Sequence, residues 1–283
     1  MTQNFTVACV QTEVSDDTAA NIERARGLAE GAVKEGAGLV CFAEYFTGLA
    51  TRDGALDPVP FAEADHPALP VFQAFARDKG VHLLLGSLGI TLQDGTVVNR
   101  SYVIDGTGGI SARYDKIHLF DVNLGPGMTY RESAVLSAGD HAVVAPTPWG
   151  GLGLSICYDL RFAHLYRALA QGGASFLAVP AAFTKKTGEV HWKILNQARA
   201  IEHGCFVFAP CSYGSVVGGG ECYGHSLIID PWGKVLAEGA GDRDMAVLAE
   251  IDTGLVDTVR SKVPALRHDR PYSVAPAAQS AAE

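Results

Sequence analysis

The strongest constraint on the fold is the order in which strand-like and helix-like segments alternate along the chain. Residues 5–11 (FTVACVQ) form an apolar run typical of a buried strand, and apolar residues recur at helical spacing from Asp17 to Lys34. A second buried strand (GLVCFAE) and a second amphipathic helix over residues 67–79 follow. A loop rich in glycine, aspartate and proline over residues 47–66 separates them. Each strand-helix unit of this kind needs a sheet on which its helix can pack.

The next part of the chain lacks helical spacing. Three strand-like segments, VHLLLGSLGI, VVNRSYVID and ISARYDKIHLF, are separated only by the turn sequences QDGT and GTGG, which predicts consecutive hairpins. The second half repeats the plan with strand GLGLSIC, a helix over Leu160–Gln171, strand ASFLAVP, a helix over Glu189–His203, strand CFVFAPCSY and three final strands, YGHSLIID, KVLAEGA and MAVLAEI. Helices and hairpin runs in both halves predict an α/β fold, a four-layer α-β-β-α sandwich with two sheets packed face to face.

The predicted sandwich needs one large core. α/β chains of this length, 283 residues, routinely form a single core, and the composition, 48% apolar and 19% charged, is that of an ordinary globular protein. We therefore expect one domain over residues 1–271. The segment 272–283 (YSVAPAAQSAAE) is small, polar and unpatterned, and we interpret it as a C-terminal tail that is loose or docked on a partner subunit.

Charge and hydropathy argue against some classes of partner. The formal net charge is -9 and no segment clusters Lys or Arg, so the attraction that drives binding to nucleic acid or anionic lipid is missing. The N-terminal MTQNFTVACVQTEV lacks a basic segment followed by an apolar one, and no apolar run is long enough to span a membrane. We expect a cytoplasmic protein that binds neither nucleic acid nor membrane. The six cysteines lack metal-type spacing, so we expect no metal site.

Three reactive side chains stand at the ends of predicted strands, where α/β folds place active sites. Glu44 follows the apolar run LVCFA, and it either caps the next turn or acts as an acid or base. Lys116, in RYDKIHLFD, lies near two aspartates and also suits a surface ion pair. Cys157 lies between strand GLGLSI and helix DLRFAHLYRALA, a strand-to-helix turn that can carry a nucleophile, although a cysteine after an apolar strand also fits the core. A helix N-terminus and a nearby ammonium would favour its thiolate.

The segments FAEYFTG, YDKIHLFD and LSICYDLRF together resemble, in order and spacing, the three signature segments of the nitrilase or carbon-nitrogen hydrolase superfamily. The resemblance covers almost the whole chain, and the three reactive residues lie 72 and 41 positions apart. It implies that Glu44 is the general base, Lys116 the oxyanion stabiliser and Cys157 the nucleophile of a cysteine-dependent amidase. In that chemistry a thioester forms and water hydrolyses it, and the backbone N–H of Tyr158 can be a second oxyanion donor.

Within the superfamily, the chain is similar to the branch that contains omega-amidases and deaminated-glutathione amidases. In that branch a HLFDV run followed by a Glu-Ser pair supplies a second glutamate, which is Glu132 here; it could instead be a surface glutamate beside Arg131. The branch also holds a substrate carboxylate with residues that match Arg161, Phe183 and Thr187. A planar guanidinium suits this role because it binds a carboxylate at two points, although Arg161 also fits an ion pair at the start of its helix.

This chain departs from the branch at Lys185-Lys186, where a hydrophobic residue and a proline are more common. The two lysines predict a more basic pocket rim, and hence a substrate with two acidic groups or a longer acidic tail. The glycine-rich segment SYGSVVGGGECYGHS lacks phosphate-binding spacing, and we interpret it as a mobile rim loop. His191, Trp192 and His203 could indicate a cysteine-histidine pair, but on an amphipathic helix such residues more often pack in the core.

The resemblance favours an amidase that releases ammonia or an amine from a small carboxylate-bearing amide, without a metal or organic cofactor. It also implies a homodimer or a higher homo-oligomer. Two alternatives stay open from the sequence. One is another reaction of the same superfamily, N-carbamoyl hydrolysis or nitrile hydrolysis. The other is a non-catalytic ligand-binding protein in which Cys157 is a redox-sensitive thiol.

Overall fold

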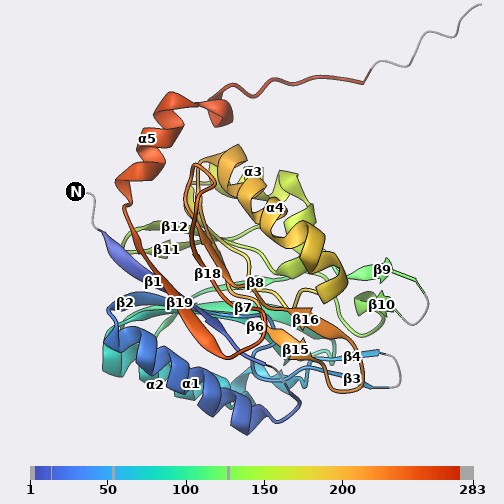
Figure 1. The fold of residues 1–283 in the computed structure, drawn as a ribbon. Coiled ribbons are helices and arrows are strands. Elements are labelled where there is room, and N and C mark those ends of the chain that lie inside the picture. The colour runs from blue at the N-terminus through green and yellow to red at the C-terminus, as the bar shows by residue number, and fades with distance from the viewer. Residues whose placement is uncertain (1–3, 14, 53–54, 126–127, 275–283) are drawn as a thin grey trace, which may run out of the picture.

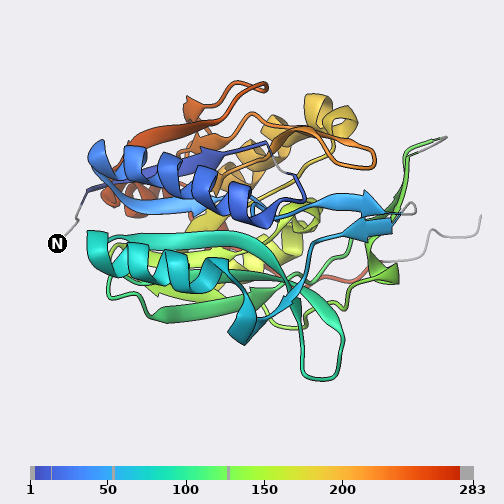
Figure 2. The same cartoon turned by 90° about the horizontal axis from the view of Figure 1, so that it is seen from below.

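Two sheets face one another, and helices cover the outer side of each (Figures 1 and 2). The computed structural model describes residues 4–13, 15–52, 55–125 and 128–274. The helices α1 (Thr18–Lys34) and α2 (Ala68–Lys79) cover one sheet, and α3 (Ala163–Gln171) and α4 (Lys185–His203) cover the other. The predicted α-β-β-α sandwich is therefore confirmed.

Each sheet has parallel strands at its centre. The first has the order β19-β1-β2-β6-β7-β8, with β5 paired to β6, and the second has the order β11-β12-β13-β14-β17-β18. The pairs β1–β2, β2–β6, β12–β13 and β13–β14 are parallel. The bounds are β1 Phe5–Gln11, β2 Ala37–Phe42, β5 Phe61–Ala62, β6 His82–Thr91, β7 Val97–Ile104, β8 Ile110–Asp115, β11 Val144–Thr147, β12 Gly150–Leu154, β13 Ala174–Ala178, β14 Phe206–Ala209, β17 Leu227–Ile229, β18 Val235–Glu238 and β19 Met245–Ile251.

The facing sides of the two sheets form the main interior. Along β1, Val7 and Cys9 belong to the apolar cluster between the sheets, whereas Ala8 and Val10 belong to the cluster that includes α1 and α2. Both faces of this strand are therefore covered. This explains why FTVACVQ is apolar without the alternation of a half-exposed strand.

The strand-helix units of the first half agree with their predicted bounds. The helix predicted from Asp17 begins at Thr18, because the Asp17 carboxylate accepts a hydrogen bond from the Ala20 N–H at 3.1 Å, as an N-cap does. Helix α2 ends where Gly80 adopts a left-handed conformation with φ 64°. The predicted hairpins are also present, since β6, β7 and β8 pair antiparallel in sequence order.

Residues 47–66 are not a plain loop, which corrects the prediction. They contain β3 (Ala50–Arg52), β4 (Ala55–Asp57), β5 and a 3-10 turn, η1 (Glu63–Asp65). Strands of two or three residues are too short to produce a recognisable alternation. The hairpin β3–β4 lies beside two others, β9–β10 (Asp121–Asn123, Thr129–Arg131) and β15–β16 (Tyr213–Ser215, Glu221–Tyr223), on the right of Figure 1.

Two helices of the second half begin at other residues than predicted. The helix expected from Leu160 begins at Ala163, because the preceding residues form a separate 3-10 turn, η3 (Cys157–Arg161). Helix α4 begins at Lys185 rather than Glu189, and it includes Gly188. A Cβ atom on Gly188 would lie 2.4 Å from the Tyr223 ring, so the glycine permits close packing and does not end the helix.

The C-terminal region contains a helix that the sequence pattern did not predict. Strand β19 pairs antiparallel with β1, and α5 (Gly254–Lys262) and a 3-10 turn, η4 (Ala265–Arg267), follow it. Of the expected tail, Tyr272 and Val274 are exposed, and residues 275–283 lie outside the described residues. In the part of the chain that the structure describes, no helix has the length and hydropathy needed to cross a membrane.

Candidate active site

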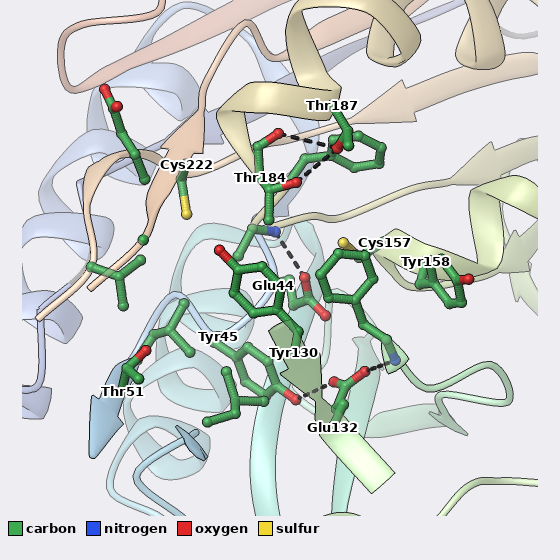
Figure 3. Close-up of a pocket in the computed structure, with 18 of the residues that line it drawn as sticks. Glu44, Tyr45, Thr51, Tyr130, Glu132, Cys157, Tyr158, Thr184, Thr187 and Cys222 are labelled. Carbon is green, nitrogen blue, oxygen red and sulfur yellow. Dashed lines mark hydrogen bonds between the residues drawn. The ribbon is translucent and has the colours of Figure 1, made fainter. Parts of the chain in front are cut away.

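Three separate strand ends bring their reactive side chains into one cavity of about 380 Å³. Figure 3 shows two of these side chains, Glu44 and Cys157. Glu44 follows β2, Lys116 follows β8, and Cys157 follows β12 as the first residue of η3. The walls include every residue that the sequence indicated for the site: Glu44, Lys116, Glu132, Cys157, Tyr158, Arg161, Phe183 and Thr187. Four hydrophobic side chains, Leu49, Leu56, Phe120 and Val216, also line it.

Lys116 is buried between two carboxylates. Its Nζ lies 3.0 Å from Oε1 of Glu44 and 3.0 and 2.8 Å from the two carboxylate oxygens of Glu132. The side chains of all three residues are at most 4% exposed. Burial alone would lower the pKa of Lys116, but Glu132 and Glu44 together raise it well above its usual value. The ammonium is therefore charged at neutral pH, and the surface ion pair is not the correct interpretation.

Glu44 is held by more donors than the sequence suggested. Its Oε1 also accepts from Nδ2 of Asn99 at 2.9 Å, and its Oε2 accepts from the Ala182 N–H at 2.8 Å. The carboxylate does not cap the turn that follows β2, because its partners come from β7 and from the segment after β13. Asn99 was missed because an asparagine in VVNRSYVID carries no motif signal.

Glu132 is a buried residue rather than a surface glutamate. Besides Lys116, it accepts hydrogen bonds from the Tyr45 hydroxyl at 3.0 Å and from the Phe120 N–H at 2.6 Å. Figure 3 shows Tyr45 pointing at this carboxylate. Burial, followed by the charges of Glu132 and Glu44, raises the pKa of Tyr45 well above its usual value, so its hydroxyl stays a donor.

Cys157 occupies a strained backbone conformation. Its φ is 48°, in the left-handed region that non-glycine residues rarely adopt, and its N–H donates to the Pro180 carbonyl oxygen at 2.9 Å. Burial raises the pKa of the thiol well above its usual value, and Glu44 raises it further, while Lys116 opposes them. The sulfur is therefore a thiol in the resting site, although the helix N-terminus and the ammonium favour a thiolate. Burial and the two carboxylates outweigh the ammonium.

The residue after the nucleophile, Tyr158, also lines the cavity. Among the described residues, no backbone carbonyl accepts the Tyr158 N–H. The Tyr158 ring is fixed edge-on by Phe120 and Phe162, with centroids 5.1 and 5.4 Å away. The role of the Tyr158 N–H as a second oxyanion donor stays a prediction.

The predicted carboxylate-binding residues form one wall. The Arg161 guanidinium lies 5.9 Å from the Tyr158 ring centroid and 5.7 Å from that of Phe183. Its Nη2 is 3.4 Å from Nδ1 of His191, and no acid pairs with it within the described part of the chain. The Thr187 hydroxyl is 2.7 Å from that of Thr184. The ion pair considered for Arg161 is thus absent from the described residues, and Arg161 lines the cavity.

Lys185 and Lys186 do not make the cavity rim basic, which corrects the sequence interpretation. Lys185 pairs with Glu221 of β16 at 2.6 Å, and Lys186 donates to the Leu124 carbonyl oxygen at 2.7 Å. Neither belongs to the cavity wall. The two lysines instead join the hairpins β15–β16 and β9–β10 to the start of α4, so they give no reason to expect a second acidic group.

The glycine-rich segment does form part of the rim. Its residues Val216 and Gly218–Gly220 line the cavity, and two hydrogen bonds attach it to β3. The Thr51 N–H donates to the Val217 carbonyl at 2.7 Å, and the Thr51 hydroxyl donates to the Gly219 carbonyl at 3.2 Å. A Cβ atom on Gly218 would lie 1.8 Å from the Thr51 carbonyl oxygen, which explains one of the glycines.

The histidines of α4 do not serve Cys157. His191, Trp192 and His203 are not among the residues that line the catalytic cavity. The Trp192 Nε1 donates to the His225 carbonyl oxygen at 2.8 Å, and His203 lines a second cavity beside α5. Within the described residues, no group of three or more side chains from His, Cys, Asp and Glu is arranged to hold a metal ion.

The chain matches a known protein family over most of its length. The family described as "Carbon-nitrogen hydrolase" matches residues 6–261. Two curated relatives cover nearly the whole chain. A deaminated glutathione amidase from Synechocystis sp. is 40% identical over 269 residues, which cover 93% of this chain and 97% of that protein. Omega-amidase NIT2 from Mus musculus is 33% identical over 270 residues, which cover 94% and 95%.

Solved structures with the same fold agree with these matches. The NitFhit protein of C. elegans superposes with a TM-score of 0.87 at 32% identity, and the match covers 95% of this chain and 66% of that one. A variant of an amidase from Nesterenkonia sp. AN1 has a TM-score of 0.76 at 25% identity, with 94% of each chain covered. In that structure the acetamide moiety of fluoroacetamide is bound covalently to the active-site cysteine.

Proposed function

This chain belongs to the carbon-nitrogen hydrolase family and is a hydrolase of C–N bonds other than peptide bonds, and we propose that it cleaves small carboxylate-bearing amides through a thioester on Cys157. The observation that supports the proposal best is the buried cluster of Glu44, Lys116 and Glu132 beside Cys157. A non-catalytic binding protein with a redox-sensitive thiol would not need a buried base, a buried cation and a nucleophile in one cavity.

The first step is proton transfer from Cys157 to Glu44 as the sulfur attacks the amide carbon. The thiol is protonated at rest because of burial and Glu44. Moving its proton to Glu44 leaves the total charge of the buried cluster unchanged, so no additional charge has to be buried. The carboxylate remains aligned during the transfer because Asn99 and Ala182 hold its oxygens.

Negative charge then develops on the amide oxygen. In the proposed geometry the Lys116 ammonium and the Tyr158 N–H meet this oxygen, and Glu132 keeps the ammonium charged and oriented. Both donors are fixed before the reaction starts, which is the condition under which oxyanion contacts accelerate a reaction most. Loss of one such donor typically lowers kcat by about 10²–10³-fold.

Collapse of the tetrahedral intermediate breaks the C–N bond. Glu44 returns the proton to the departing nitrogen, so ammonia or an amine leaves neutral and a thioester remains on Cys157. Water then attacks the thioester carbon while Glu44 accepts one of its protons. The carboxylic acid leaves, and the proton returns from Glu44 to the Cys157 sulfur.

We assign the substrate's carboxylate to the wall formed by Arg161, Phe183 and Thr187. Arg161 supports this assignment because it is a cation of the cavity wall without an acidic partner among the described residues. The relatives named deaminated glutathione amidase and omega-amidase support the same substrate class. The planar guanidinium would bind the carboxylate at two points and turn the amide toward Cys157.

The proposal is tested with succinamate, glutaramate and the monoamides of dicarboxylic ketoacids, using ammonia release as the assay. We expect turnover by the wild type and loss of turnover in Cys157→Ala, Glu44→Gln and Lys116→Ala. Mass spectrometry of quenched reactions should detect the acyl adduct on Cys157. Turnover close to wild type in any of the three variants would contradict the assigned roles.

Product analysis separates this proposal from the other reactions of the superfamily. An N-carbamoyl hydrolase releases carbon dioxide together with ammonia, whereas an amidase releases no carbon dioxide. Conversion of a nitrile, with no turnover of any amide, would favour a nitrilase. Tight binding of an acid without turnover of any substrate would favour the binding protein.

We also propose that the chain forms a homodimer or a higher homo-oligomer. Helix α4 supports this, because Val190, Ile194 and Ile201 on it are 57%, 67% and 56% exposed. Exposed apolar side chains at helical spacing are typical of an association surface. Sedimentation should give a mass above the 29.8 kDa of one chain. A purely monomeric enzyme at micromolar concentration would contradict this proposal.

Two further expectations are retained as proposals. A single domain over residues 1–271 is supported by the interior that both sheets share, and it predicts one cooperative unfolding transition. A cytoplasmic location is supported by the six cysteines, all of which are buried and unpaired, as suits a reducing compartment. Fractionation of cells with an antibody against the chain would test the location.

A further inference from the structure

Another buried carboxylate, Asp159, belongs to the turn η3 that carries the nucleophile. Asp159 is 0% exposed and does not line the catalytic cavity. Its Oδ2 accepts from the Ile156 N–H at 2.9 Å and from the Tyr114 hydroxyl at 2.7 Å. Its Oδ1 accepts from the His118 N–H at 3.0 Å and lies 2.7 Å from Nδ1 of the same histidine. Four polar groups therefore converge on one carboxylate that cannot contact the substrate.

These contacts join the two chain segments that carry the reacting groups. Ile156 immediately precedes Cys157, and His118 lies two residues after Lys116. The Asp159 carboxylate thus accepts one main-chain N–H from the segment of Cys157 and one from the segment of Lys116. A bond to the main chain constrains backbone position more directly than a bond to a side chain, so Asp159 can set the relative placement of the two segments.

Other contacts hold the same turn. The His118 ring stacks on Phe162, which follows η3, with centroids 3.5 Å apart and an interplanar angle of 9°. Arg199 of α4 donates twice to the Leu160 carbonyl oxygen, at 3.1 and 2.9 Å. The left-handed conformation of Cys157 is costly by itself and persists only where its surroundings fix it. Of these contacts, those of Asp159 and His118 also connect the turn to the segment that carries Lys116.

We propose that Asp159 and His118 form a positioning pair that fixes the Cys157 sulfur relative to the Lys116 ammonium. The inference rests on the proposed function, in which sulfur and ammonium act on the same carbonyl group. Neither Asp159 nor His118 lines the cavity, so both act through the residues that they hold. Disturbing the pair should therefore lower kcat, while substrate binding at Arg161 changes much less.

The variant Asp159→Asn disturbs the pair with almost no change of shape. Its NH₂ group must replace one oxygen, and each oxygen accepts one main-chain N–H. If the NH₂ group replaces Oδ1, the His118 N–H loses its acceptor, and if it replaces Oδ2, the Ile156 N–H does. The side chains can adapt, because the Tyr114 hydroxyl and a neutral imidazole nitrogen can accept hydrogen bonds. One of the two main-chain contacts is lost in either orientation.

The experiment compares kcat and KM of Asp159→Asn with those of wild type, per folded enzyme, on the best amide substrate. A misplacement of about 1 Å typically costs about 10²-fold in rate, so we expect kcat to fall about 10–100-fold and KM to change less than about threefold. An exposed aspartate of α2, Asp78, 63% exposed, provides the matched control Asp78→Asn. Wild-type kcat in folded Asp159→Asn, or an equal loss in kcat and in substrate affinity, would overturn the proposal.

Two variants of His118 separate the hydrogen bond from the ring stack. His118→Asn can still donate to Asp159 but loses the stack on Phe162, whereas His118→Phe keeps the stack and loses the bond. We expect His118→Asn to retain more kcat than His118→Phe, and the reverse order would contradict the assignment. These variants keep the Asp159 carboxylate, so they test the pair even if Asp159→Asn does not fold.

Alkylation of Cys157 by chloroacetamide provides a second test, which does not depend on amide turnover. The reagent places a carbonyl beside the sulfur, so its rate constant should fall in folded Asp159→Asn relative to Asp78→Asn. If the wild type turns over no amide, the proposed function fails. The alkylation test still decides whether Asp159 and His118 position the sulfur. An alkylation rate identical in both variants would overturn the positioning role.

Discussion

Glu132→Gln tests the assignment of Glu132 as the residue that orients Lys116. The glutamate accepts four contacts, two from Lys116 and one each from the Tyr45 hydroxyl and the Phe120 N–H. Glutamine keeps the shape and removes the charge. Its NH₂ group should take the place of Oε1, because the Tyr45 hydroxyl can accept a hydrogen bond there, whereas the Phe120 N–H beside Oε2 cannot.

This orientation removes one of the two Lys116 contacts and leaves the other. A hydrogen bond to a charged group contributes about 1.5–3 kcal/mol, which corresponds to about 10–150-fold in kcat/KM if the bond matters fully in the transition state. The pKa of Lys116 should also fall. Burial lowers that pKa, and Glu132 is the largest opposing influence, so its neutralisation shifts the balance toward the neutral amine. The alkaline limb of the rate profile should move to lower pH.

The assay is the pH dependence of kcat/KM for Glu132→Gln and for a matched control, Glu221→Gln. Glu221 also lines the cavity but is 48% exposed and pairs with Lys185 rather than Lys116. We expect a reduced maximum and an alkaline limb displaced to lower pH in Glu132→Gln only. An unchanged alkaline limb with a normal maximum would refute the reasoning that Glu132 keeps the ammonium charged.

Three other perturbations have defined outcomes. Glu44→Gln should abolish turnover. It should also shift the pH dependence of Cys157 alkylation by iodoacetamide to lower pH, because the charge of Glu44 raises the pKa of the thiol. An unchanged pH dependence of alkylation, followed by mass spectrometry, would contradict this. Gly218→Ala should raise KM more than Gly219→Ala, since both have positive φ but only the former would collide with β3; equal KM values would argue against this contact. Burial lowers the pKa of His203 from 6.5 to about 4. As the pH falls from 6.5 to 4, this histidine is therefore protonated in the unfolded chain but still neutral in the folded one. The wild type loses stability in that pH range. His203→Leu should reduce this loss, by up to about 3 kcal/mol, in urea titrations at pH 7 and pH 4.5.

The sequence predicts the sandwich because its strongest signals are local and repeated. A strand buried on both faces, such as β1, must be apolar throughout, and a helix on the outer layer must be apolar on one face only. These demands act on neighbouring residues, so they can be recognised without knowing what lies across the core. The strand ends at Glu44, Lys116 and Cys157 could be located for the same reason.

The sequence predicts poorly those features that depend on partners distant along the chain. Asn99 and Asp159 hold the site through hydrogen bonds to residues 55 and 41 positions away, and nothing near them in sequence marks that role. Lys185 and Lys186 were misread because their charge is visible in the sequence, while their partners, Glu221 and the Leu124 carbonyl, are not. Charge at a position predicts electrostatics only once its neutralising neighbours are known.

The same limit applies to the protonation state of Cys157. A helix N-terminus and an ammonium both favour a thiolate, and the sequence displays both, whereas the burial that opposes them is a property of the fold. At rest the cluster holds Glu44, Glu132 and Lys116, so a thiolate would be a third negative charge beside one cation. Protonated sulfur is thus the lower-energy state, and the thiolate forms only as Glu44 takes the proton. In this arrangement the base can be a carboxylate, and no imidazole is needed. The proton donor, Cys157, and the acceptor, Glu44, share one buried cavity, so the transfer between them leaves the total charge of the cavity unchanged.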